Sequence, residues 1–465
     1  MLGVLCAGMF LVLLDVTVVN VALPGIGTSL GTDLPGLQGV VDGYAVAIAG
    51  LLLGGGALGD RIGHRRMTLI GLGLFGVASL ACGTAPGPES LIAARVVQGA
   101  GAALLLPGSL AVITAIYPGR AEQARALGVW AGISSTALPA GPLLGGALVD
   151  SVGWRWIFLV NVPIVAAAMV GVLALVREPR RPATAEERPL DRAGMILAPA
   201  ALGTLVWTVI AAGHGQRGAA GAALIATLVL WAAFVVVERR ATAPMVPGGL
   251  LRAPAFLGAN MIALIMNLVT NGVLFVVTLH LQQQQGHSAL TAGTMLLPMA
   301  VPLALLAPVS GRLTARFGTR LPLTAGTAIA AAGSLWLMSA GPNGSYVALL
   351  PVLVGIGVGD GLIVTAAVAG AMRAAPAEHA GLAGGFNNTA RQVGTALGVA
   401  VYGAVAGSAS RAHVAQSHAA QSHAAQSLAD QAHAAHFTSG LHTLAWVSLG
   451  LWLVALALTR IVPAR

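Results

Sequence analysis

The sequence predicts an all-α integral membrane protein with fourteen transmembrane helices, organised as two six-helix bundles with a two-helix insertion. Composition is the first observation: 57% of the 465 residues are hydrophobic, 8% are charged, and the mean hydropathy is +0.85. Soluble proteins carry about 25% charged residues. The second observation is that apolar stretches of about 20 residues, long enough to span roughly 30 Å of hydrocarbon, recur from end to end. Such long runs exclude a transmembrane β-barrel, whose strands alternate over about 10 residues.

The third observation is the placement of arginine, because the chain contains no lysine. Most arginines lie in short loops that alternate along the chain, as the positive-inside rule requires, and only Arg155, Arg217 and Arg411 fall in loops on the opposite side. This pattern predicts a plasma-membrane protein with both termini in the cytoplasm. It also explains the net charge of +9 without a nucleic-acid partner. The predicted spans are 2–24, 38–59, 67–85, 90–116, 124–148, 155–176, 193–212, 219–238, 256–281, 288–311, 321–340, 346–372, 380–406 and 439–461.

An internal repeat indicates how these spans are grouped. "GALGDRIGHR" (56–65) and "GRLTARFGTR" (311–320) share the frame G-x-L-x-x-R-x-G-x-R, and both lie in predicted cytoplasmic loops. Repeats of this kind are typical of transporters built from two bundles that move against each other around a central site. We therefore expect an N-terminal bundle at 1–176, inserted helices with their linkers at 177–255, and a C-terminal bundle at 256–465. The last part includes a low-complexity outer loop at 408–436.

Several charged residues lie inside predicted spans. Asp15 interrupts the apolar run "LLDVTVVNVALP", Asp42 lies in the second span, and Arg95 lies in the fourth. A charged side chain at the centre of a bilayer costs roughly 2.5–3.5 kcal/mol on insertion scales, so such residues face the interior of the protein and usually have a function. At about 1.5 Å per residue, all three lie in the outer half of the N-terminal bundle.

Separate motifs in a fixed order give the chain a family resemblance. They are "LDVTVVNVALP", "GALGDRIGHRR", "RVVQGAGAALLLP", "AGPLLGG", "WRWIFLVNVP" and "GGFNNTARQVGTALG". With these motifs the chain resembles the fourteen-helix drug:proton antiporters of the major facilitator superfamily over essentially its whole length. The resemblance implies proton-driven export of small molecules.

For the three charged residues, the resemblance implies a role in proton coupling. Burial favours the protonated form of a carboxylate, whereas a nearby arginine favours the ionised form. We therefore expect Asp15 to be a proton site, Asp42 to be a second acid, and Arg95 to be the cation for which both compete. The alternative for Asp15 and Arg95 is a structural ion pair that holds two helices in register. The alternative for Asp42 is a side chain that reaches the outer interface.

Two further motifs in the first half predict conformational roles. The first cytoplasmic loop predicts a latch whose acid pairs with arginines or with the end of a helix dipole in one conformational state, and the alternative is a plain tight loop. Its residues are Gly56, Asp60, Arg61, Gly63 and Arg65. In the fifth span, prolines bend the helix and glycines permit close helix approach, and the resemblance identifies the antiporter signature. Its residues are Pro139, Gly141, Pro142, Gly145 and Gly146.

The second half carries its own polar residues. Asp360 and Arg391 lie about equally far from the loop that joins their spans, so we expect a charge pair near the midplane; the alternative is that Asp360 meets only water, or a cationic substrate. Asn387, Asn388 and Gln392 form a polar face that either lines the substrate path or links helices.

The resulting hypothesis is a proton-coupled exporter of lipophilic, cationic or amphipathic compounds. The alternatives are an exporter dedicated to one natural product, a non-transporting sensor or assembly protein on the same scaffold, and an importer. The sequence contains no phosphate-binding loop, and we expect no enzymatic activity, cofactor, nucleotide or metal. Histidines in the outer loop could instead be interpreted as a metal-binding tract. The expected partners are protons, a small-molecule substrate and the lipid bilayer, and the expected state is a monomer.

Overall fold

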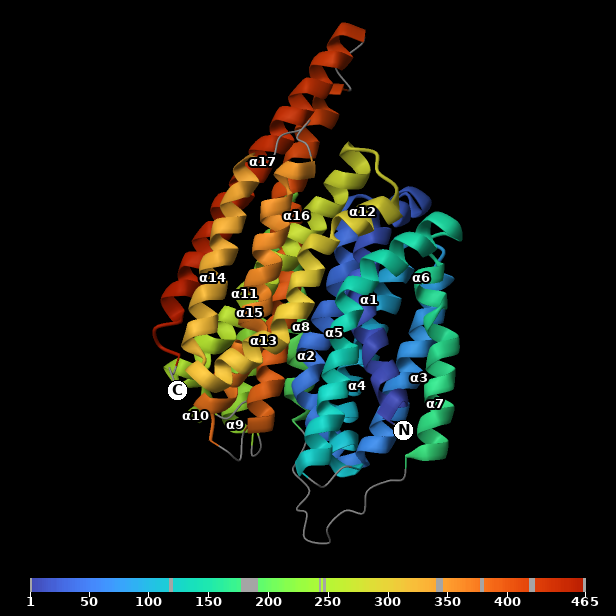
Figure 1. Cartoon of the computed structure of the whole chain (residues 1–465). Coiled ribbons are helices and arrows are strands. Elements are labelled where there is room, and N and C mark those ends of the chain that lie inside the picture. The colour runs from blue at the N-terminus through green and yellow to red at the C-terminus, as the bar shows by residue number, and fades with distance from the viewer. Residues whose placement is uncertain are drawn as a thin grey trace. The chain divides into compact units, whose positions relative to one another are not determined.

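Every regular element is a helix in the part of the chain that the computed structural model describes (Figure 1). These residues are 2–116, 120–176, 191–241, 244–245, 248–339, 346–376, 380–417 and 423–462. Within them, the side chains at 4, 56–57, 60, 110–111, 114–115, 120–121, 123–124, 127–128, 130–132, 134–135, 380–381 and 407–439 are not described. The all-helical class predicted from composition is confirmed.

The helices follow one another along the chain with short connections. The first group is α1 (Leu2–Leu30), α2 (Leu34–Ile62), α3 (His64–Gly83), α4 (Pro88–Ile116), α5 (Arg120–Ser151), α6 (Trp156–Leu159) and α7 (Asn161–Leu175). The second group is α8 (Arg192–Gly213), α9 (Arg217–Arg240) and α10 (Gly248–Leu251). The third group is α11 (Pro254–Leu279), the π-helical η1 (His280–Gln284), α12 (Ala289–Met295), α13 (Leu297–Phe317), α14 (Arg320–Leu335), the 3₁₀ turns η2 (Trp336–Ser339) and η3 (Tyr346–Ala348), α15 (Leu350–Ala374), α16 (Ala380–Ser417) and α17 (His423–Leu458).

A helix overlaps each of the fourteen predicted spans. Among the described residues, twelve helical stretches are long and apolar enough to cross a membrane. The predicted spans 124–148 and 380–406 are the two outside this set, although α5 and α16 cover them. The count of fourteen therefore stays a prediction, whereas the multi-pass membrane class is supported by the twelve.

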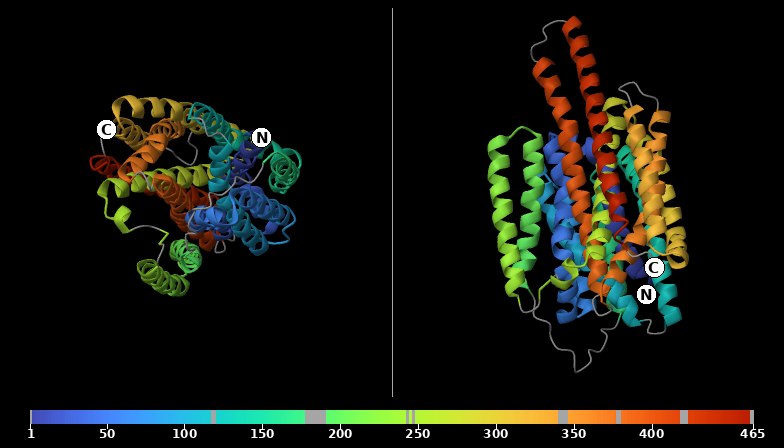
Figure 2. Two further views of the ribbon diagram at one scale, coloured as in Figure 1. Left: turned by 90° about the horizontal axis from the view of Figure 1, so that it is seen from below. Right: turned by 90° about the vertical axis from the view of Figure 1, so that its left-hand side faces the viewer.

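Two compact units divide the chain. Unit 1 comprises Met1–Leu205, Ile225–Gly248 and His287–Met295, and unit 2 comprises Val206–Leu224, Gly249–Gly286 and Leu296–Arg465. The inserted helices α8 and α9, two neighbouring antiparallel helices in Figure 2, contribute residues to both units. The predicted three-part division at 176 and 255 stays a prediction.

Unit 1 is built on pairs of closely packed helices. Helices α2 and α3 both pack on α4, and α1 packs on α5. The α1–α5 contact depends on the absence of a side chain, because a Cβ placed on Gly141 would lie 1.8 Å from Thr17 Oγ1. In a membrane, where lipid competes equally for apolar surface, such small-residue contacts are a main source of helix association.

Unit 2 has the same kind of packing around α11 and α15. Helix α11 packs on α16, while α13 and α14 pack on α15. A Cβ on Gly394 of α16 would lie 2.2 Å from the carbonyl oxygen of Leu264 on α11. This close contact fixes the position of α16 along α11, and with it the positions of the side chains on the two facing surfaces.

The repeated loop has the same backbone geometry in both copies. Gly63 between α2 and α3 has φ +94°, and Gly318 between α13 and α14 has φ +83°. Each donates its N–H to the preceding helix, to Gly59 O at 3.0 Å and Thr314 O at 3.1 Å respectively. L-residues with a side chain rarely adopt such φ values, so the glycine in each repeat is required by a tight helix-to-helix turn.

Candidate functional site: a buried charge cluster in unit 1 and a polar cluster in unit 2

Asp15 and Arg95 form an ion pair in the interior of unit 1. Asp15 is on α1 and Arg95 is on α4, and each is 1% exposed. Arg95 Nη1 donates a hydrogen bond to Asp15 Oδ2. The sequence predicted that these two charges share a depth, and the close α1–α4 packing brings them together.

Gln98 completes this pair. It lies on α4 one turn after Arg95, so both side chains project from the same face of the helix. Gln98 Nε2 donates to Asp15 Oδ1 at 3.0 Å, and Gln98 Oε1 accepts a hydrogen bond from Arg95 Nη1 at 2.6 Å. Both carboxylate oxygens of Asp15 therefore have a donor.

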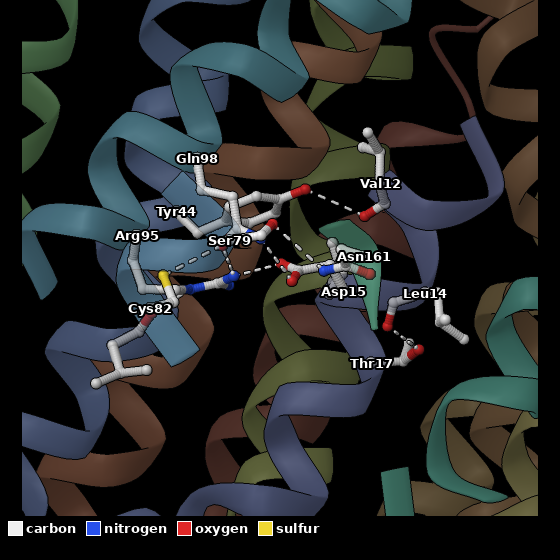
Figure 3. A network of polar contacts seen from close by, with 12 residues as sticks. Val12, Leu14, Asp15, Thr17, Tyr44, Ser79, Cys82, Arg95, Gln98 and Asn161 are labelled. Carbon is white, nitrogen blue, oxygen red and sulfur yellow. Dashed lines mark hydrogen bonds and ion pairs between the residues drawn. The ribbon is translucent and has the colours of Figure 1, made fainter. Parts of the chain in front are cut away.

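A second layer of polar groups holds Gln98 (Figure 3). Ser79 Oγ on α3 accepts a hydrogen bond from Gln98 Nε2 at 2.9 Å and a longer one from Asn161 Nδ2 on α7 at 3.5 Å. The thiol of Cys82 approaches Gln98 Oε1 at 3.7 Å. Four helices thus contribute to one connected network.

The remaining contacts orient the guanidinium of Arg95. Its Nε donates to the carbonyl oxygen of Val40 on α2 at 3.0 Å, and its Cζ lies 4.2 Å from the ring centroid of Tyr44. The Tyr44 hydroxyl donates to the carbonyl oxygen of Val12 on α1 at 3.1 Å. A cation over an aromatic ring gains about 2 kcal/mol when it is desolvated. The cation therefore has a fixed place whether or not Asp15 is ionised.

The chemistry available to this cluster is the exchange of a counter-ion for a proton. An ionised Asp15 needs Arg95 and Gln98, because a buried charge without a partner is strongly destabilising. A protonated Asp15 does not need the arginine. Proton binding is thereby linked to whether α1 and α4 are held together at this point.

Asp42 lies outside the network. Asp42 is 3% exposed, and neither of its carboxylate oxygens has a hydrogen-bond partner among the described residues. Arg95 Nε bonds to the Val40 carbonyl rather than to this acid. The predicted competition of Asp42 for Arg95 is thus not seen in this geometry and stays a prediction.

The predicted latch is described in part. Arg61 is exposed, Gly63 makes the tight turn described above, and Arg65 Nη2 donates to the carbonyl oxygen of Leu173 on α7 at 3.0 Å. Asp60 and Gly56 lie outside the residues whose side chains the structure describes. The conformational role of this loop stays a prediction.

The antiporter signature lies within the continuous helix α5. Pro139 and Pro142 are inside this helix, where they remove two backbone donors. A Cβ on Gly145 would lie 3.1 Å from the Val18 carbonyl of α1, and one on Gly146 would lie 2.5 Å from Cα of Leu290 on α12. The predicted close approach of helices along this face is present.

In unit 2, the structure brings Asp360 to Thr270 rather than into a bond with Arg391. Thr270 Oγ1 on α11 donates to Asp360 Oδ2 on α15, and Asp360 is 2% exposed. Arg391 lies on α16, and no ion pair within 4.0 Å joins these two described residues. The predicted direct charge pair stays a prediction.

The predicted polar face on α16 does link helices. Asn387 Nδ2 donates to Asn260 Oδ1 of α11 at 3.1 Å, and Thr395 Oγ1 accepts a hydrogen bond from Asn271 Nδ2 of α11 at 3.2 Å. Asn388 and Gln392 are half-buried. Linking helices does not exclude lining a path, so the second role stays open.

The groups that complete both clusters were not predicted from the sequence. Gln98 carried a signal, because it follows Arg95 by three residues on one helix face. Ser79, Asn161 and Thr270 carried none, since a hydroxyl or amide in an apolar helix usually bonds within its own helix. The predicted histidine tract lies outside the residues whose side chains are described, and the described part of the chain has no group of three or more metal-ligating residues.

Residues 5–399 match the family model described as "Major Facilitator Superfamily". The chain is 37% identical over 408 residues to "Multidrug resistance protein Stp" of Mycobacterium tuberculosis (strain CDC 1551 / Oshkosh), covering 86% of this chain and 74% of that protein. It is also 37% identical over 410 residues to "Tetracenomycin C resistance and export protein" of Streptomyces glaucescens, with the same coverage of 86% and 74%.

A solved structure supports the fold. The chain aligns with the crystal structure of a D-xylose-proton symporter with a TM-score of 0.68 at 13% identity, covering 100% of this chain and 97% of that one. At this identity the similarity shows the fold alone. That protein is a symporter, so the fold does not determine the direction of transport.

Proposed function

Because the chain belongs to the Major Facilitator Superfamily, we propose that it is a proton-coupled antiporter that exports lipophilic, cationic or amphipathic small molecules such as drugs or antibiotics. It is a multi-pass protein of the cell membrane that acts on small molecules. The finer parts of the proposal are export rather than uptake, cytoplasmic termini and a monomeric state.

The observation that carries the proposal is the fully bonded, buried cluster of Asp15, Arg95 and Gln98. A purely structural link between two helices does not need a carboxylate, because replacing a buried ion pair with apolar residues is often neutral or stabilising. A carboxylate that can exchange its arginine for a proton supplies what coupling requires. Asp42, buried without a hydrogen-bond partner, is the second acid that we assign to proton movement.

The proton gradient supplies sufficient energy for this work. Each proton that moves down a potential of 100 mV releases roughly 2.3 kcal/mol. Since 1.4 kcal/mol corresponds to a tenfold concentration ratio, one proton supports roughly a fortyfold gradient of a neutral substrate. No ATP-binding motif is then required.

We assign the conformational changes of the transport cycle to two motifs of unit 1, the loop between α2 and α3 and the glycine face of α5. The loop with Asp60, Gly63 and Arg65 would act as a state-dependent latch. The α5 face with Gly141 and Gly146 would allow neighbouring helices to pack closely in one state. Both assignments rest on the resemblance and on the tight turns and contacts at these glycines.

The test uses everted membrane vesicles that contain the wild-type chain or Asp15→Asn. A proton gradient is established and monitored with a pH-sensitive dye while lipophilic cations and antibiotics are added one by one. We expect the wild type to dissipate the gradient with some compounds and Asp15→Asn to abolish this response. Glu122→Gln, which removes an exposed acid at the start of α5, is the matched control and should respond as the wild type does.

The outcomes separate the alternatives. If Asp15→Asn responds like the wild type, Asp15 is a structural charge and coupling must be assigned to Asp42 or Asp360. Counterflow of a labelled compound in vesicles of known orientation distinguishes export from uptake. A response to one compound class alone would favour a dedicated exporter, which the relative named for tetracenomycin C makes the second candidate.

A further inference from the structure

Asp360 and Arg391 are two opposite charges in unit 2 that are not bonded to each other. Asp360 projects from α15, Arg391 projects from α16, and both helices pack on α11. Within the described residues no ion pair under 4.0 Å joins them. In a low-dielectric interior such a pair gains most by direct contact. Its separation therefore needs an explanation.

Each of these two residues keeps an unused hydrogen-bonding atom. Asp360 Oδ2 accepts from Thr270, but Asp360 Oδ1 is buried without a partner, and Arg391 Nε is likewise buried without a partner. Asn387 Oδ1 and Thr389 Oγ1, also on α16, are likewise buried without a partner. Buried polar atoms are almost always paired, because an unpaired one costs about 1–3 kcal/mol. The open atoms thus comprise an anion, a cation and two neutral groups.

Glycines on α15 determine the direction in which Asp360 points. A Cβ on Gly359 would lie 2.6 Å from the Gly326 carbonyl of α14, and one on Gly357 would lie 2.2 Å from the Met299 carbonyl of α13. These glycines dock α15 on α13 and α14. Asp360 is left to face α11, where it meets Thr270.

We propose that Asp360 and Arg391 form the binding site for the polar head of an amphipathic zwitterion, whose ammonium group binds Asp360 and whose carboxylate binds Arg391. The inference rests on the proposed function only in assuming that unit 2 takes up a ligand. An ammonium donates to Asp360 Oδ1, and a carboxylate accepts from Arg391, so the unsatisfied atoms become paired. The rest of the ligand is apolar.

A singly charged ligand fits this pair less well. A cation at Asp360 is repelled by Arg391, and an anion at Arg391 is repelled by Asp360. A zwitterion gains from both charges at once. Hydrogen bonds to charged groups contribute enough that removing one should weaken binding about 10- to 100-fold.

The experiment measures binding to the purified full-length chain in lipid nanodiscs. The probes are norfloxacin, a fluorescent zwitterion with an amine and a carboxylate, its methyl ester, which is a cation, and its N-acetyl derivative, which is an anion. The variants are Asp360→Asn and Arg391→Gln. Thr327→Ala on α14 is the control, because that buried hydroxyl bonds only to carbonyls of its own helix.

We expect the wild type and Thr327→Ala to bind norfloxacin at least about tenfold more tightly than either derivative. Asp360→Asn should remove the preference over the N-acetyl derivative, and Arg391→Gln should remove the preference over the ester. This crossed pattern cannot arise from general unfolding, because each variant loses discrimination at one end of the probe and keeps it at the other.

Three results would overturn the inference: equal binding of the three probes, tighter binding of the ester than of norfloxacin, or no binding of any probe. Drug-driven proton flux in the vesicle assay would still support the proposed function in each case. Crossed selectivity in nanodiscs without proton flux in vesicles would support the binding site and contradict proton-coupled export. The two failures are therefore distinguishable.

Discussion

The two units carry their buried charges in opposite ways. In unit 1, Asp15 and Arg95 are bonded directly, and Gln98 satisfies both partners. In unit 2, Asp360 and Arg391 remain unbonded, and each keeps a buried atom without a partner. In both pairs the acid lies on one helix and the arginine on another, and the two helices are in contact. The difference lies in what completes each pair.

This difference indicates a division of work. A closed cluster changes when a proton replaces the arginine, because the carboxylate then no longer requires its counter-ion. An open pair changes when a ligand bridges it. Coupling and recognition are therefore expected to reside in different clusters, the first in unit 1 and the second in unit 2.

The largest expected difference in stability between the two units appears when the arginine of each pair is replaced in turn. Arg95→Gln leaves Asp15 without its counter-ion and should lower the free energy of unfolding by about 3–5 kcal/mol. Arg391→Gln breaks no ion pair and should change it by less than about 1 kcal/mol. Both values can be measured by titration with sodium dodecyl sulfate in detergent micelles. Equal losses would mean that the two pairs do not differ energetically.

Replacing the bridging amide is expected to have the next largest effect. Gln98→Leu removes one donor to Asp15 and one acceptor for Arg95, and should cost about 2–3 kcal/mol because both partners are charged. Gln98→Glu keeps the shape and should restore the bond to Arg95 while repelling an ionised Asp15. We expect compound-driven proton flux to fall in both variants and to recover at lower pH only in Gln98→Glu. Unchanged flux in Gln98→Leu would show that the amide is not needed for coupling.

The hydroxyl that contacts Asp360 should have a smaller effect. Thr270→Val removes the hydrogen bond to Asp360 Oδ2 and should destabilise unit 2 by about 1 kcal/mol, towards the upper range for hydrogen bonds between helices in membranes. Thr270→Ser keeps the hydroxyl and is the control. If the pair is a ligand site, norfloxacin binding should weaken in Thr270→Val and not in Thr270→Ser. If both variants bind norfloxacin equally well, the hydroxyl of Thr270 does not contribute to recognition of the ligand.

The smallest effect is expected from removing the hydroxyl group of the ring beneath Arg95. Tyr44→Phe removes the hydrogen bond to the Val12 carbonyl but keeps the aromatic face, and should cost about 0.6 kcal/mol. Tyr44→Leu also removes the cation–π contact and should cost about 2 kcal/mol more. The same unfolding titration measures both. A larger loss for Tyr44→Phe than for Tyr44→Leu would show that the ring does not stabilise the guanidinium.

Much of unit 1 could be anticipated from sequence because its signals are local. An aspartate and an arginine inside apolar runs must be buried in the protein, and their distances from the loops gave matching depths. Gly63 and its counterpart Gly318 in unit 2 repeat in one frame, and each is required by a turn with positive φ. The same depth argument predicted a charge pair of Asp360 and Arg391, which stays a prediction.

The sequence by itself determined that this chain is a helical membrane protein, which residues lie at which depth, and that charges are buried in both halves. Hydrophobic length and the placement of arginine carry that information, and both are properties of single segments. Only the tertiary structure decided which charges are bonded, because depth does not fix the direction in which a helix faces. Close glycine contacts place Asp360 where it meets Thr270, whereas α1, α3, α4 and α7 converge on the network of Asp15. The direction in which each helix faces is set by packing between segments that are distant in the sequence, so it cannot be predicted from any one segment.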